Sequence, residues 1–309
     1  MKLAVHCYSK VKKNCFKYLK SQETKTDKFK NKERMIKSFL IPLCFWISKK
    51  ADKKRPYFVG LAGGQGTGKT TISSLIKIIL TRYFKLKVFK ISIDDFYKTR
   101  KERLSLSNRI HPMLLTRGVP GTHDINMMLN FFRKVKSKKF KKLKLPTFNK
   151  AIDDRFNKKK WYNLRNKPDV IIFEGWCVGA KSEKNSSLKK TINSMEKVKD
   201  QKQIWRKYVN QQLKLKYKNL YSQLSCLIYL KAKNFNLLQQ WRLKQERKLW
   251  VKSKKKINLK IMNKNDVINF MQTYQRITQN MFKHTPKYAS IIFKLDNKHQ
   301  ISSAIYKKK

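Results

Sequence analysis

The sequence predicts an α/β protein in which a parallel β-sheet lies between helices on both faces, a three-layer α/β/α arrangement. Three observations lead to this prediction. Short apolar runs recur along the chain, and the stretch from Val170 to Phe173 is uninterrupted, as in a strand buried on both faces. Segments with apolar residues at helical spacing separate these runs. All nine glycines lie between Gly60 and Gly179, and five of them are in or beside one loop.

That loop follows the first apolar run, Tyr57 to Ala62, and has the pattern G-x-x-x-x-G-K-[ST]. The motif consists of Gly63, Gly64, Gln65, Gly66, Thr67, Gly68, Lys69 and Thr70, and Thr71 continues into a helical pattern. A strand, a glycine loop and a helix form the context that a phosphate-binding loop requires. We expect Lys69 to reach the β- and γ-phosphates and the Thr70 hydroxyl to bind Mg²⁺. The sequence therefore predicts a nucleoside triphosphate site on a P-loop NTPase-type sheet.

Composition limits the partners. The 309 residues carry a formal net charge of +58, which would suit a nucleic acid. However, lysine runs are scattered along the chain, at 138–142, 158–160, 252–256 and 307–309, without the interleaved aromatic residues of a nucleic-acid motif. We therefore favour compositional bias and expect no nucleic-acid partner. Five cysteines without a C-x-x-C pair indicate reduced thiols, and no apolar segment is long enough to span a membrane, so we expect a cytoplasmic protein.

The N-terminal region is predicted to differ from the rest. Residues 1–35 are basic and weakly patterned, so we expect a frayed or loosely helical lead-in. The pattern of residues 38–50 predicts an amphipathic helix that packs Phe39, Leu43 and Trp46 against the domain.

The second predicted strand, residues 87–93, ends in two adjacent carboxylates and a tyrosine. Asp94, Asp95 and Tyr97 follow it directly, and the carboxyl edge of an open α/β sheet faces the ligand crevice. A carboxylate at this edge could accept the proton of an attacking hydroxyl. It could equally cap a turn. Beside a phosphate loop, we favour catalysis for one of the two.

A compact loop follows, with two glycines and two prolines between His111 and Gly121. We expect Thr122 to cap a helix that starts near Ile125. Arg117 and His123 could contact a substrate carboxylate or phosphate, or could belong to a purely structural loop.

The strand after this loop, residues 168–176, delivers Glu174 to its carboxyl end, where the carboxylate would hold Mg²⁺ directly or through water. Between the loop and this strand, residues 145–155 predict a short hairpin or the base of a lid. A polar loop is expected at 181–200 and a helix from about 201 to 220 with Ile204, Trp205 and Leu213 near one face.

The C-terminal part predicts strands at 226–230 and 290–295, the latter being the last strand, and helices from about 235 and at 266–282. On the first of these helices, Arg242 could close over the triphosphate as part of a lid and stabilise the transition state. A solvated basic helix face is the alternative.

Six motifs in this order carry a family resemblance: GGQGTGKTT, SIDDFY, RGVPGTHD, LPTFNKAIDDR, DVIIFEGW and WRLKQE. Over roughly residues 40–300, the chain resembles D-glycerate 3-kinases and their bacterial relatives, within the phosphoribulokinase/uridine kinase group of P-loop kinases. The resemblance implies ATP- and Mg²⁺-dependent phosphorylation of the 3-hydroxyl of D-glycerate. It implies a kinase domain over 51–309 with a lid around 234–256, preceded by a basic extension over 1–50.

The resemblance also implies site roles. Asp94 corresponds to the general base, assisted by Lys69 and Arg242, and Glu174 corresponds to the metal-supporting acid. The substrate side is implied to comprise Asp95, Tyr97, Arg117, His123, Asp124 and Arg155. Three alternatives remain open: a nucleoside, pantothenate or another hydroxy acid as acceptor. A nucleotide-dependent nucleic-acid-binding ATPase is a further one.

Overall fold

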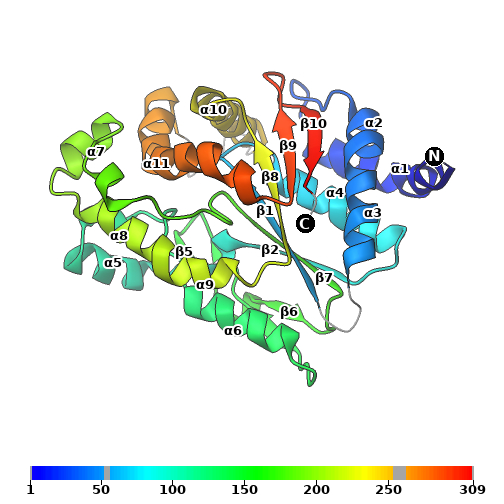
Figure 1. The fold of residues 1–309 in the computed structure, drawn as a ribbon, viewed down its shortest axis with the longest axis horizontal. Coiled ribbons are helices and arrows are strands. Elements are labelled where there is room, and N and C mark those ends of the chain that lie inside the picture. Colours follow the sequence, from blue (N-terminus) through cyan, green and yellow to red (C-terminus); the bar gives the residue numbers. More distant parts are fainter. Residues whose placement is uncertain (1, 52–55, 253–261, 308–309) are drawn as a thin grey trace.

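The computed structural model describes residues 2–51, 56–252 and 262–307. Its centre is a six-stranded sheet in the order β10-β9-β8-β1-β7-β2 (Figure 1). The strands are β1 (Tyr57–Gly63), β2 (Val88–Ser92), β7 (Val170–Gly175), β8 (Cys226–Lys231), β9 (Ile291–Leu295) and β10 (Ile301–Tyr306). Five of them pair in parallel, and β10 pairs antiparallel with β9. The prediction of a mainly parallel sheet is confirmed.

Helices cover both faces of this sheet. In Figure 1, α1 (Lys2–Gln22), α3 (Ile41–Lys50) and α4 (Lys69–Arg82) lie to one side of it, whereas α6 (Ile125–Lys136), α8 (Ile204–Gln212) and α9 (Lys218–Tyr221) lie to the other. The remaining helices are α2 (Lys32–Arg34), α5 (Arg100–Arg109), α7 (Ser194–Lys199), α10 (Phe235–Lys252) and α11 (Lys264–Tyr288). No helix in the described part of the chain is long and apolar enough to cross a membrane.

Two small antiparallel ladders lie outside the main sheet. The strands β3 (Leu143–Leu145) and β6 (Tyr162–Leu164) form one, and β4 (Phe148–Asn149) and β5 (Asp154–Arg155) form the other. The second ladder is the hairpin predicted at 145–155, and its turn projects residues 150–153 towards the carboxyl end of β2, where Lys150 meets Asp94.

The alternation of side chains along the strands produces two cores. Along β7, Val170 and Ile172 face the cluster that contains α1, α3 and α4, whereas Ile171 and Phe173 face the cluster that contains α6 and α8. Successive side chains of a strand point to opposite faces, so a strand in the middle of the sheet must be apolar throughout. This explains the uninterrupted apolar run that predicted the strand.

Of the two forms predicted for the lead-in, frayed or loosely helical, the helical one is correct, and residues 2–22 form the regular helix α1. Its Cys7, Val11, Cys15 and Leu19 recur every four residues and are all fully buried in the core beside α4. Burying a side chain such as Leu19 contributes about 1.5–3 kcal/mol, which outweighs the weak propensity of a lysine-rich sequence. The lysines of α1 occupy the remaining positions and concealed this stripe.

Three predictions need correction. The strand at 290–295 is not the last, because β10 follows it and forms one edge of the sheet. Residues 181–200 are not a loop throughout, since α7 forms within them. The helix predicted from about 201 to 220 is present and runs from α8 through a π-helical segment over Leu213–Tyr217 into α9, but Ile204 is 43% exposed instead of buried with Trp205 and Leu213.

Candidate active site

The phosphate loop lies between β1 and α4 at the carboxyl edge of the sheet. Gly66 and Gly68 have positive φ angles of 77° and 85°, which favour glycine, and α4 begins immediately afterwards at Lys69. A Cβ atom on Gly66 would lie 2.9 Å from Cβ of Trp241, so α10 packs directly on the loop. The first N–H groups of α4 have no partner within the helix, and with the helix dipole they form an anion site.

Lys69, Thr70 and Glu174 lie together at this helix N-terminus. Lys69 Nζ donates to Gly64 O at 3.0 Å. The Thr70 hydroxyl lies 3.1 Å from Oε1 and 3.3 Å from Oε2 of Glu174. The strand pairing explains this meeting, because β1 and β7 are parallel neighbours and both end at this edge. The predicted metal-binding hydroxyl and carboxylate are thus adjacent.

Burial leaves charges of both signs incompletely compensated here. Glu174 is 4% exposed, and burial raises its pKa against the attraction of Lys69 and Lys90. Burial also lowers the pKa of Lys69, against the attraction of Glu174 and Asp94. A buried carboxylate gains from a cation, and a buried ammonium gains from an anion. A polyphosphate carrying a divalent cation supplies both.

The two adjacent carboxylates after β2 have different surroundings. Ser92 caps a 3₁₀ turn over Ile93–Phe96, and Asp95 completes its capping box by accepting from Ser92 N at 3.3 Å. Burial raises the pKa of Asp95 to about 6, partly offset by that hydrogen bond. Asp94 does not take part in the box through its side chain. The turn therefore uses one carboxylate for structure and leaves the other at the sheet edge.

Both oxygens of Asp94 have partners. Oδ1 accepts from the Tyr97 hydroxyl at 2.9 Å, and Oδ2 accepts from Lys150 Nζ at 2.9 Å. Burial raises the pKa of Asp94, but the charge and hydrogen bond of Lys150, with the Tyr97 hydrogen bond, outweigh it and lower the pKa to about 2. Asp94 is therefore ionised at neutral pH, which a general base must be.

The loop from Arg117 to Asp124 is fixed by contacts from distant elements. Trp176 Nε1 donates to Gly118 O at 2.9 Å, which joins the loop to the residue after the Glu174–Gly175 strand end. Thr122 does not cap α6 as predicted: its hydroxyl accepts from Gly118 N and donates to Val119 O, while Asp124 is the cap and accepts from Met127 N. Both hydrogen bonds of the Thr122 hydroxyl are made within the loop, so Asp124 is left to cap the helix.

His123 is buried beside the catalytic edge. Its ring stacks on Tyr97 with centroids 4.5 Å apart, and Nδ1 lies 2.6 Å from the Tyr217 hydroxyl. Burial lowers its pKa to about 4, although the charge of Asp94 opposes this shift. His123 Nε2 has no hydrogen-bond partner among the described residues. His123 is thus neutral at pH 7 and holds Tyr97 in place, whereas a direct substrate contact stays a prediction.

Three arginines converge around the β4–β5 hairpin. Arg155 donates from Nε to Tyr97 O at 2.7 Å and from a terminal nitrogen to Asp124 Oδ2 at 3.2 Å. Arg117 forms an ion pair with Asp153, and Arg103 lies 3.0 Å from the same carboxylate. Arg103 is fully buried, and it also donates to three carbonyl groups. The hairpin is therefore anchored beside Asp94.

Arg242 lies near the phosphate loop, but its guanidinium does not point into it. Its backbone N would be 3.0 Å from a Cβ on Gly66, whereas its side chain pairs with Glu246 and lies over the Phe270 ring. Arg242 Nε has no hydrogen-bond partner within the described part of the chain. The predicted lid range, 234–256, corresponds to α10 up to Lys252, and residues 253–256 lie outside the described residues. The catalytic role of Arg242 stays a prediction.

A basic depression lies next to the phosphate loop. It has a volume of about 650 Å³ at the carboxyl ends of β8 and β9, and the lysines that line it are Lys231, Lys233, Lys294 and Lys298. Leu230 of β8 pairs with Gly63, and a Cβ on Gly68 would be 3.9 Å from His299, next to Lys298. The volume suits a small ligand, and the lysines suit an anionic one.

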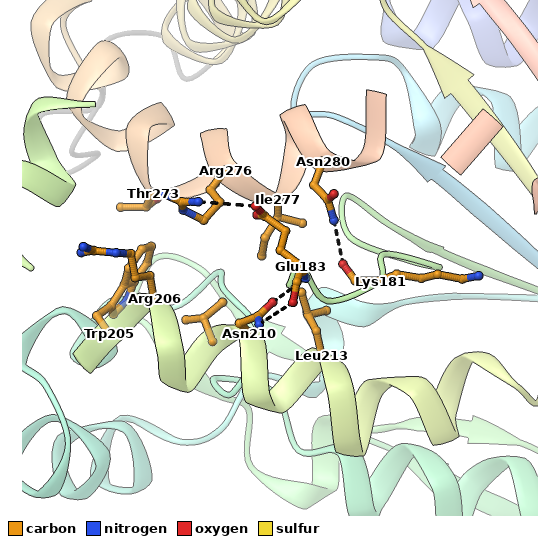
Figure 2. Close-up of a pocket in the computed structure, with 11 residues that line it drawn as sticks. Lys181, Glu183, Trp205, Arg206, Asn210, Leu213, Thr273, Arg276, Ile277 and Asn280 are labelled. Atoms are coloured by element: carbon orange, nitrogen blue, oxygen red, sulfur yellow. Dashed lines mark hydrogen bonds and ion pairs between the residues drawn. The ribbon is translucent and has the colours of Figure 1, made fainter. Parts of the chain in front are cut away.

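A second, enclosed cavity lies away from this edge (Figure 2). It has a volume of about 10 Å³, room for at most about one water, between α8, α11 and the segment after β7. Asn210 and Glu183 exchange hydrogen bonds of 2.8 and 3.1 Å, and Asn280 Nδ2 donates to Lys181 O at 2.9 Å. These polar contacts hold the segment in place, so we assign the cavity a structural role.

Sequence reasoning missed several residues that shape the site. Lys150 and Arg103 had no local signature, since their partners lie 56 and 50 residues away along the chain. Trp176 stands in a motif, but its bond to Gly118 depends on the fold. Cys177 is fully buried, and burial raises its pKa to about 12, so it packs as a small apolar side chain.

Comparisons with known proteins agree with this geometry. No family model matches the chain. An uncharacterised kinase of Schizosaccharomyces pombe is 30% identical over 257 residues, which are 79% of this chain and 84% of that protein. The chloroplastic D-glycerate 3-kinase of Arabidopsis thaliana is 26% identical over 226 residues, 67% of this chain, and the match spans 47% of that longer protein.

A solved structure agrees as well. The D-glycerate 3-kinase of Cryptococcus neoformans var. grubii matches with a TM-score of 0.69 and 22% identity over 87% of this chain and 97% of that one, which supports the fold. The family predicted from the sequence motifs is confirmed. The chain belongs to the D-glycerate 3-kinase-like P-loop kinases, ATP-dependent phosphotransferases that use an alcohol group as acceptor.

Proposed function

We propose that this chain phosphorylates the 3-hydroxyl of D-glycerate with ATP and Mg²⁺ and forms 3-phosphoglycerate and ADP. The observation that carries the proposal is the position of Asp94, a carboxylate that the 3₁₀ turn does not use and that lies within electrostatic reach of Lys69 of the phosphate loop. An enzyme that only hydrolysed ATP would need to position water, whereas a carboxylate at this edge suits an alcohol acceptor.

On the nucleotide side, the residues from Gly63 to Thr71 would hold the triphosphate with their backbone N–H groups and the positive end of α4. Lys69 would neutralise charge on the β- and γ-phosphates. The lysines of the basic depression at the ends of β8 and β9 would add positive charge beside the phosphate loop. We propose that residues 234–252 act as a lid in which Arg242 exchanges Glu246 for the triphosphate.

The donor set at Thr70 and Glu174 fits Mg²⁺. In the described residues, no group of three or more His, Cys, Asp or Glu side chains could hold a metal by itself. Mg²⁺ is commonly bound by one or two protein oxygens together with water and substrate phosphates, as this pair would allow. Bound there, Mg²⁺ would neutralise charge on the phosphates during transfer.

On the acceptor side, Asp94 would take the proton from the hydroxyl while that oxygen forms its bond to the γ-phosphorus. The bond from that phosphorus to the bridging oxygen breaks, and ADP leaves with the electron pair. Tyr97 and Arg155 position Asp94 through the contacts described above. We propose that Arg117 and Arg155, with Asp95, His123 and Asp124, line the acceptor pocket, where arginine suits a carboxylate.

We also propose that residues 51–309 form the kinase domain and that residues 1–50 are an extension packed on it. The shared core of α1, α3 and α4 supports this packing. A nucleoside, pantothenate or another hydroxy acid remains an alternative acceptor. A nucleic-acid-binding ATPase is a weaker alternative, which would bind nucleic acid with a steep dependence on salt.

The test is ADP release by the purified protein with Mg-ATP and, in turn, D-glycerate, L-glycerate, uridine, pantothenate or no acceptor. We expect turnover with D-glycerate. The Asp94→Asn variant should lose about 10²- to 10⁴-fold in kcat with D-glycerate, the usual contribution of a general base, while binding of ATP measured by calorimetry is kept.

Asp169→Asn is the matched control, because Asp169 precedes the amino end of β7, at the edge of the sheet opposite to Asp94, and its loss should leave kcat unchanged. Turnover with another acceptor only would replace the substrate. Hydrolysis of ATP that needs no acceptor and is unaffected by Asp94→Asn would refute the kinase mechanism proposed for this site.

A further inference from the structure

Lys150 forms an ion pair with Asp94, the carboxylate that is proposed to take the proton of the acceptor hydroxyl. It stands in the turn between β4 and β5, and its ammonium lies 2.9 Å from Asp94 Oδ2. Oδ1 accepts from Tyr97. Each carboxylate oxygen can accept a further hydrogen bond, but both donors compete with a substrate hydroxyl for Asp94, and the ammonium also competes for its negative charge.

Burial identifies the partner that can move. Tyr97 is 4% exposed, stacks on His123, and its carbonyl is held by Arg155. The Lys150 side chain is 63% exposed and makes an ion pair with a carboxylate that is itself 30% exposed. Ion pairs of this kind contribute little net stability and exchange readily. Lys150 is therefore the partner that can leave.

The surrounding turn fixes the backbone of Lys150 while its side chain stays free. Asp153, three residues further on, is held by Arg103 and Arg117, and Arg117 also reaches Lys150 O at 3.5 Å. The Lys150 ammonium can thus swing without a change in the hairpin. It would remain close to Arg117, whose guanidinium lies over the ring of Phe148 in the same hairpin.

We propose that Lys150 determines acceptor specificity by exchanging Asp94 for an anionic group of the acceptor. An acceptor that carries a carboxylate next to its hydroxyl draws the Lys150 ammonium away from Asp94, so that Oδ2 can accept the hydroxyl proton without a competing cation. A neutral polyol offers Lys150 no other anion, so Lys150 stays paired with Asp94 and competes with the hydroxyl. This inference rests on the proposed kinase function and narrows its substrate to anionic hydroxy compounds.

The test compares D-glycerate with glycerol, which has the same carbon chain and no carboxylate, in wild type and in Lys150→Met. We expect kcat/KM for D-glycerate to fall roughly 10- to 100-fold, mostly through KM, as for loss of a charge-assisted hydrogen bond. For glycerol, kcat/KM should stay constant or rise. Lys150→Arg should retain most of the preference for D-glycerate over glycerol. Lys159→Met removes an exposed lysine from the segment after the β4–β5 hairpin and should change kcat/KM for neither acceptor.

A second measurement is ADP release without acceptor. Loss of the Lys150 ammonium beside Asp94 should raise this hydrolysis roughly two- to five-fold in Lys150→Met, because the carboxylate then lacks its exposed ion pair. The rise should disappear when Asp94→Asn is added. A merely structural role for Lys150 would lower all activities together, and an equal fall with D-glycerate and glycerol, without the rise in hydrolysis, would overturn the proposal.

Failure of the proposed substrate gives a different result from failure of this inference. If wild type uses pantothenate in place of D-glycerate, the same comparison is made with pantothenate and its neutral alcohol, panthenol, and a collapse of that preference in Lys150→Met supports the role of Lys150. If wild type uses only a neutral acceptor such as uridine, the inference is wrong although the kinase function holds.

Discussion

Arg276 lines the structural cavity of Figure 2, and removal of its guanidinium should destabilise the protein strongly. Arg276 Nε and a terminal nitrogen donate to the two oxygens of Glu196 at 2.7 and 2.6 Å, and further bonds reach the carbonyls of Ser187 and Lys190. Glu196 is 0% exposed. An Arg276→Met variant would leave this carboxylate buried without its cation.

Breaking a buried ion pair from one side costs about 3–5 kcal/mol. A chain of 309 residues has an unfolding entropy of about 0.65 kcal/mol/K, so this loss corresponds to a fall in Tm of about 5–8 °C. Differential scanning calorimetry measures it. The double variant Arg276→Met with Glu196→Gln should lose less, because no unpaired charge remains.

Lys283→Met, at an exposed position of the same helix, is the control and should not change Tm by more than about 1 °C. The reasoning would be refuted by a single variant that melts within about 2 °C of wild type. It would also be refuted if the double variant were less stable than the single one, because the unpaired Glu196 would then not be the cause.

Two other outcomes follow from the site. Because the folded-state pKa of His123 is lowered by burial from 6.5 to about 4, the unfolded chain binds the proton first, and stability is lost as pH falls from 6.5 towards 4. In urea titrations over this range, His123→Gln should lose less free energy of unfolding than wild type, by up to about 3 kcal/mol; equal losses would contradict the assignment. Asp27 pairs with Lys244 and Lys248 of α10, the helix proposed above as the lid over the triphosphate. Because these ion pairs hold the lid in position, Asp27→Asn should raise KM for ATP roughly two- to five-fold at low salt. Convergence with wild type in 0.5 M salt is expected from screening, and a difference that persists there would exclude an ionic cause.

The sequence predicted the phosphate loop, the strands around it and the position of Glu174, because these depend on local properties. A glycine loop needs particular backbone angles, and a strand buried on both faces needs an apolar side chain at every position, as from Val170 to Phe173. Both requirements are visible in a short window of residues. The same holds for the helical stripe of α1, which was present in the sequence but concealed among lysines.

The residues by themselves left Asp94 and Asp95 equivalent and only the family resemblance favoured Asp94, whereas the tertiary structure gives the two carboxylates different partners. The two are neighbours in the sequence, yet the 3₁₀ turn directs one carboxylate back to Ser92 N and the other towards Tyr97 and Lys150. The meeting of Lys150 with Asp94 joins positions 56 residues apart, and no local pattern encodes such a contact. The sequence by itself thus determined most of the elements and the position of the phosphate-loop motif. The packing of distant segments decided which carboxylate the 3₁₀ turn uses and which cation pairs with the other, because those contacts exist only once the chain has folded.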